Sequence, residues 1–84
     1  MNVLNGKIIM PSRMTVYVRF LAGTDIKEAI IEAKQKCREW NVAYICFSFN
    51  GVNLSISGVC NIDIAVREFN KVISENDTHK YVVE

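Results

Sequence analysis

The sequence predicts one small α+β domain over residues 1–84, with two helices on one face of an antiparallel sheet and the other face open. Three observations predict this class. Hydrophobicity alternates in three short segments, an Asn-Gly pair joins two of these segments, and two longer segments have the helical period of 3.6 residues. The resulting order, strand, helix, hairpin, helix, strand, is the βαββαβ order of ferredoxin-like domains.

The first alternating segment is TVYVRF, residues 15–20. Val16, Val18 and Phe20 alternate there with Thr15, Tyr17 and Arg19, as in a half-buried strand. A shorter strand is predicted before it, over residues 7–10, because Asn5-Gly6 precedes that stretch as a turn and Pro11 ends it.

The first helix is predicted after Thr24 or Asp25, either of which can be its N-cap. Glu28 follows Asp25 at the spacing of a capping box. Its apolar stripe consists of Ile26, Ile30, Ala33, Cys37 and Trp40, with Ala29 at the flank. Trp40 is therefore expected to be largely buried against the hairpin, whereas the Lys, Arg and Glu rows are expected to form a solvated face.

Asn50-Gly51 predicts a type I′ hairpin, because both residues tolerate positive φ. The turn then sets the register of the two strands. The apolar pairs are Phe49 with Val52, Phe47 with Leu54, and Ile45 with Ile56. The opposite face pairs Ser48 with Asn53, Cys46 with Ser55, and Tyr44 with Ser57. The hydrophobic pattern and the turn geometry thus predict the same register.

A second helix is predicted after Asn61, which can cap it. Its buried stripe consists of Ile62, Val66, Phe69 and Ile73. The final residues, HKYVVE, can supply one more short strand. With both helices on the apolar side, the other face of the sheet is left open.

The open face is the predicted binding site. Its expected ligand- or partner-binding residues are Tyr17, Arg19, Tyr44, Ser48, Asn53, Ser55 and Ser57, with Cys46 among them on the same face. A sheet face that meets only water usually carries several charges, but this one has a single charge. Small hydroxyl and amide groups around tyrosines suit close contact with another surface, and we expect a homo-oligomer. Tolerated serines, or N-terminal residues folded over the face, remain alternatives.

Composition and motifs argue against most other function classes. The net charge of +1 favours neither a strongly basic nucleic-acid binder nor an acidic nucleic-acid mimic. The apolar runs are too short or too interrupted for a signal peptide or membrane span, so we expect a cytoplasmic protein. Three cysteines without C-x-x-C spacing and a lone His79 predict no metal site and no cofactor. No catalytic constellation is recognisable, so an enzyme is not expected.

Two alternatives remain. The first is a module for single-stranded nucleic acid that uses Tyr17, Arg19 and Tyr44, since RRM domains stack bases on the open face of a sheet. The strand VNLSIS, however, offers serines where an RRM carries aromatic and basic residues. The second is an enzyme whose pocket contains His79 or a thiol, such as Cys60, whose pKa a helix start could lower.

The phrase FSFNGVNLSIS, followed by the helix NIDIAVREFNKV and preceded by a compact amphipathic helix, resembles small accessory proteins encoded by bacteriophages and prophages over residues 24–74. The resemblance implies host-takeover work in the host cytoplasm, including anti-defence inhibition by binding a host protein or by sequestering a small nucleotide-like ligand. It transfers no functional residue, and the near-neutral charge departs from inhibitors that imitate DNA.

Overall fold

The computed structural model describes residues 13–75 and 81–84. The elements follow the predicted βαββαβ order along the chain. They are β1 (Thr15–Tyr17), α1 (Ile26–Trp40), β2 (Tyr44–Phe49), β3 (Val52–Ile56), α2 (Ile62–Glu75) and β4 (Tyr81–Val83). The strand expected at residues 7–10 lies outside the described residues.

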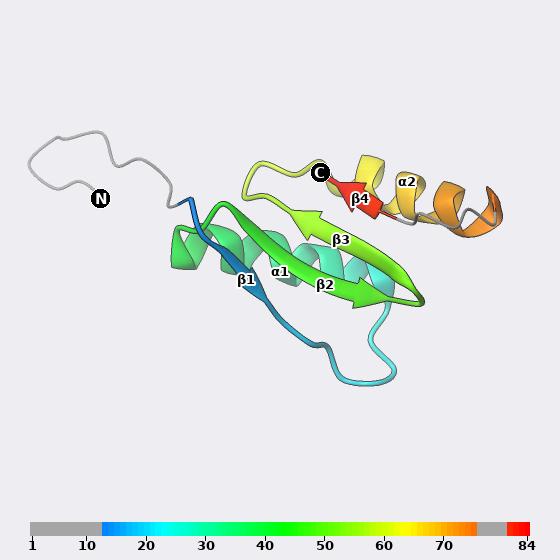
Figure 1. Ribbon diagram of the computed structural model, residues 1–84, viewed down its shortest axis with the longest axis horizontal. Coiled ribbons are helices and arrows are strands. Elements are labelled where there is room, and N and C mark those ends of the chain that lie inside the picture. Colours follow the sequence, from blue (N-terminus) through cyan, green and yellow to red (C-terminus); the bar gives the residue numbers. More distant parts are fainter. Residues whose placement is uncertain (1–12, 76–80) are drawn as a thin grey trace, which may run out of the picture.

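The sheet differs from the prediction in its strand order and direction. The order is β1-β2-β3-β4, with β1 parallel to β2, β2 antiparallel to β3, and β3 parallel to β4. The prediction of an antiparallel sheet is therefore wrong. Each helix connects two neighbouring strands, and these two strands run parallel. In the split arrangement of ferredoxin-like domains, another strand lies between the two. Here β1 and β4 are the edges of a mixed sheet (Figure 1).

The central hairpin confirms the predicted turn and register. Asn50 and Gly51 have φ of 51° and 81°, the positive values that a type I′ turn requires. Across the turn, Phe49 pairs with Val52 and the register continues to Ile45 opposite Ile56. The hairpin therefore presents one apolar face and one polar face, as the alternation predicted.

The boundaries of both helices follow local hydrogen bonding. The Asp25 carboxylate accepts the N–H of Lys27 at 3.1 Å, and Glu28 accepts the N–H of Asp25 at 3.3 Å. This confirms the capping box. Asn41, in the left-handed conformation at φ 52°, ends α1, and the Asn61 side chain accepts the N–H of Ile64 at 3.0 Å at the start of α2.

Both helices cover the same face of the sheet. α1 packs on β2 and β3, α2 packs on β3 and β4, and the helices contact each other. The buried core consists of Ala29, Ile30, Ala33, Cys37, Val42, Ile45, Phe47, Val52, Leu54, Ile56, Cys60, Ala65, Phe69 and Val82. Val16, Val18, Phe20 and Phe49 pack against it at its margin. The predicted layering, with two helices on one face, is confirmed.

Two residues of the predicted helix stripes are not buried. Trp40 is 49% exposed, because it lies at the end of α1, which packs on β2 and β3 and not on the edge strand β1. Ile73 is 39% exposed, because α2 is centred on Ala65 and Phe69 and places Val72 against the core instead. The expectations of a largely buried Trp40 and of a buried Ile73 are therefore wrong.

Candidate binding site on the open sheet face

The face of the sheet opposite the helices carries no charged residue within the described strands. Its strand residues are Thr15, Tyr17, Tyr44, Cys46, Ser48, Asn53, Ser55, Tyr81 and Val83. The register aligns Tyr17, Cys46, Ser55 and Val83 in one row across all four strands. The open face is therefore continuous from one edge of the sheet to the other.

Exposed aromatic side chains mark both edges of this face. Tyr17 on β1 is 81% exposed and Tyr81 on β4 is 64% exposed. Between them lies a shallow hollow of about 460 Å³. Cys46, Ser48, Asn53 and Ser55 contribute to its floor. The arrangement offers apolar contact area at the edges and hydrogen-bonding groups at the centre.

The central residues of the predicted site lie together as expected from the hairpin register. Ser48 and Asn53 are exposed and face each other across β2 and β3. Ser55 is half-buried, and its Oγ lies 3.4 Å from the Cys46 sulfur. Cys46 is on this face but only 7% exposed, so its thiol belongs to the floor and not to the accessible surface. Tyr44, half-buried, lies at the start of β2.

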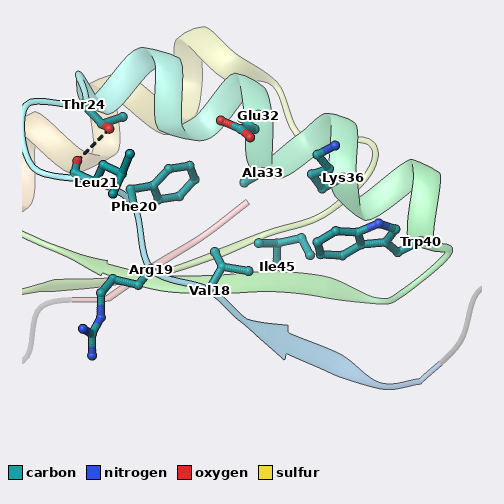
Figure 2. A pocket seen from close by; sticks show the side chains of 10 residues that line it. All are labelled: Val18, Arg19, Phe20, Leu21, Thr24, Glu32, Ala33, Lys36, Trp40 and Ile45. Carbon is teal, nitrogen blue, oxygen red and sulfur yellow. Dashed lines mark hydrogen bonds between the residues drawn. The ribbon is translucent and has the colours of Figure 1, made fainter.

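Arg19 and Ser57 lie at the margins of the site. Arg19 follows the end of β1, and its guanidinium points away from α1, toward the open side of the sheet (Figure 2). Ser57 follows the end of β3, where its hydroxyl donates to the carbonyl of Glu84 at 2.9 Å and accepts the N–H of Val59 at 3.3 Å. The Ser57 hydroxyl thus connects the end of β3 to the chain after β4.

Sequence reasoning missed Tyr81 and Val83 as members of the open face. β4 pairs with β3 in parallel, placing Tyr81 beside Asn53 and Val83 beside Ser55. The alternation in Tyr81-Val82-Val83 was the available signal, because it places the outer two side chains on one face and Val82 on the other. It could not indicate which face of the sheet they would occupy.

The remaining cysteines are buried, and their thiols are not activated. Burial raises the pKa of the Cys37 thiol, whose sulfur donates to the carbonyl of Val42 at 3.1 Å. Burial, followed by the negative charge of Glu84, raises the pKa of the Cys60 thiol. The idea that a helix start lowers the pKa of Cys60 is therefore wrong, because removal of the thiol from water disfavours the thiolate more strongly.

The raised thiol pKa values predict a loss of stability at alkaline pH. In the unfolded chain the thiols ionise near their ordinary pKa of 9.0, whereas in the folded chain Cys37 and Cys60 retain their protons to higher pH. The stabilisation is complete below pH 9.0 and declines as the pH rises through the raised values. We expect the free energy of unfolding, measured by urea unfolding between pH 7 and 10.5, to fall more steeply with pH for the wild type than for a variant with Cys37→Ala and Cys60→Ala. An equal dependence of this free energy on pH in the two proteins would contradict the prediction.

Within residues 13–75 and 81–84, no three His, Cys, Asp or Glu side chains are grouped so that they could hold a metal ion. Neither of the two described helices has the length and apolar character needed to cross a membrane. His79 lies outside the described residues.

Fold and site together define a small α+β domain with a four-stranded mixed sheet and an uncharged open face. Comparisons with protein-family models, curated proteins and solved structures give no match to this chain. Its function is therefore inferred from the chemistry of its surfaces.

Proposed function

We propose that this protein is a non-enzymatic binding protein that works as a homo-oligomer, with the open sheet face of one copy packed against that of a second copy. The observation that carries the proposal is the lack of charge on the strand residues of this face. Exposed Tyr17, Tyr81 and Val83 supply apolar area on the same face. A water-facing sheet surface would be expected to contain charges that keep copies apart.

An uncharged face is suited to contact with itself. In a two-fold dimer the same patch is present on both sides, so any charge near the axis would meet an identical charge. Ser48, Asn53 and Ser55 avoid this repulsion. Hydroxyl and amide groups both donate and accept hydrogen bonds, so identical residues can pair across the axis. A second copy therefore suits this face better than a strongly charged partner does.

The wider role follows from the resemblance to bacteriophage accessory proteins in FSFNGVNLSIS and the helices around it. In that role the oligomer binds a host protein, or sequesters a small nucleotide-like ligand, in the host cytoplasm. The proposal assigns no catalytic residue, metal or cofactor.

Single-stranded nucleic acid is the second candidate for this face. Tyr17 and Tyr81 flank the polar hollow, and Arg19 points to the same side of the sheet (Figure 2). Aromatic rings can stack on bases while a guanidinium pairs with phosphate. One arginine beside an uncharged surface gives little phosphate attraction, however, which favours the second copy.

Ser55→Lys should convert the oligomer into a smaller, folded species. Ser55 lies in the central row of the open face, so the change places an ammonium in a contact that excludes water, where an unpaired charge is strongly unfavourable. Light scattering at micromolar concentration should report the loss of mass, and circular dichroism the retained fold. Asn53→Lys, at an exposed position, should act in the same way.

The matched control is Asn70→Lys, which adds the same charge at an exposed position on α2. It should leave the assembly mass unchanged. A monomeric wild type, or folded Ser55→Lys and Asn53→Lys variants of wild-type mass, would contradict the proposal. Binding of a single-stranded oligonucleotide that weakens steeply with salt and is lost in Arg19→Ala would instead favour the nucleic-acid function.

A further inference from the structure

A second surface feature lies away from the open face, on the helix side of the sheet edge. It is a pocket of about 270 Å³ between α1 and residues 18–21, which continue the chain from β1 (Figure 2). Its volume lies just below the range of roughly 300–1,000 Å³ found for pockets that hold drug-sized ligands. A suitable ligand is therefore small.

The interior of this pocket is apolar. Ala33 and Ile45, both almost fully buried, line it together with Val18. The rings of Phe20 and Trp40 lie at opposite ends (Figure 2). Phe20 is held by an edge-to-face contact with Phe47, at 4.9 Å between ring centroids. Two aromatic rings at the ends of an apolar hollow favour a compact aliphatic or aromatic group between them.

Three charged residues line the pocket, namely Arg19, Glu32 and Lys36. The guanidinium of Arg19 points away from α1, so the charges of the rim come from Glu32 and Lys36, which lie on the same side of α1 (Figure 2). Glu32 and Lys36 are one helical turn apart, a spacing that brings side chains close together. Glu32 forms no ion pair with any described residue, whereas the Lys36 ammonium lies 3.4 Å from Glu39 and 6.0 Å from the centroid of the Trp40 ring. The exposed Lys36–Glu39 pair is weak, so Lys36 can exchange it for a ligand carboxylate at little cost.

We propose that this pocket binds a free amino acid with an apolar side chain, in its zwitterionic form. The side chain occupies the space between Phe20 and Trp40. At the rim, Glu32 receives the α-ammonium and Lys36 the α-carboxylate. A phosphate-bearing ligand would place negative charge beside Glu32, and an apolar side chain within a partner protein lacks the two backbone charges. Because the pocket is on the helix side of the sheet, it remains accessible when the open face is covered.

Trp40 provides a direct readout, because it is the only tryptophan in the chain and is half-exposed at the pocket. Titration with L-phenylalanine should shift its emission to shorter wavelength as the ligand displaces water. A dissociation constant on the order of millimolar is expected for so small a ligand. 2-Phenylethylamine, which lacks the carboxylate, and 3-phenylpropionate, which lacks the ammonium, should each bind roughly three- to tenfold more weakly, as expected for loss of one partly exposed charge pair.

Two variants separate the charge contacts. Glu32→Gln should weaken the binding of L-phenylalanine and leave the binding of 3-phenylpropionate unchanged. Lys36→Gln should weaken the binding of L-phenylalanine and leave the binding of 2-phenylethylamine unchanged. The matched controls, Glu75→Gln on α2 and Lys27→Gln on α1, lie outside the pocket and should bind like the wild type. Circular dichroism checks that all four variants are folded.

The proposal is overturned if L-phenylalanine and L-leucine leave the Trp40 emission unchanged up to 20-fold above the expected millimolar constant. It is also overturned if either single-charge analogue binds as tightly as L-phenylalanine. Light scattering of the same samples tests self-association independently of amino-acid binding, because the Ser55→Lys variant should form a smaller assembly and still bind the amino acid.

Discussion

Phe47→Lys should leave the protein unfolded at room temperature. Phe47 is 4% exposed in the middle of β2, faces α1, and contacts the ring of Phe20 edge-on. Truncating a buried phenylalanine costs about 3–5 kcal/mol, and burying an unpaired ammonium adds to that cost. A domain of this size has a free energy of unfolding near the lower end of about 5–15 kcal/mol, so little or no stability would remain.

Ser48→Lys is the matched control for folding, because Ser48 is the next residue on β2 and points away from the core, to the open face of the sheet. It should retain the far-ultraviolet circular dichroism spectrum and a cooperative thermal transition, whereas Phe47→Lys should show neither. A folded Phe47→Lys protein would mean that the helices do not pack on this face of the sheet.

Gly51→Val should destabilise the central hairpin through its backbone conformation. Gly51 has a φ of 81°, and a side chain added there would meet no other atom within 4 Å. The cost is therefore conformational: about 1–2 kcal/mol for an ordinary residue in the left-handed region, and more for a β-branched one. Urea unfolding should show a lower midpoint with an unchanged slope.

Asn50→Gly is the complementary test of the turn, because glycine adopts the positive φ of this position without strain. It should lower the free energy of unfolding by at most about 1 kcal/mol, because glycine gives the unfolded chain more conformational freedom. Equal destabilisation by both substitutions would show that side-chain contacts, and not the type I′ backbone, hold the turn.

The two candidate surfaces have different chemistry and lie on different sides of the molecule. The open sheet face is broad, uncharged and marked by exposed tyrosines, which suits a second protein surface. The pocket beside Trp40 is small, apolar inside and charged at its rim, which suits a small zwitterion. A protein that uses both would be an oligomer in which each copy can still bind a ligand.

The elements and the hairpin could be predicted because their signals are local. Asn50-Gly51 sets a register that the alternation of Phe47, Phe49 and Leu54 supports, and Asp25 with Glu28 caps α1. The same register placed Ser48, Asn53 and Ser55 together on the open face. Turn geometry and period depend on residues close in sequence, so a single chain is enough to indicate them.

Only the tertiary structure decided which strands are neighbours and which residues lie at the edges. Alternation in Tyr81-Val82-Val83 is compatible with any place in the sheet, but parallel pairing with β3 brings Tyr81 and Val83 to the open face. The helical period places Trp40 on the apolar stripe of α1. Its exposure depends on which residues of the sheet it faces, and at the edge beside β1 it lines the pocket and stays half-exposed. Pairing between distant strands is selected by the packing of the whole core, and neither a turn nor a period in the sequence specifies it.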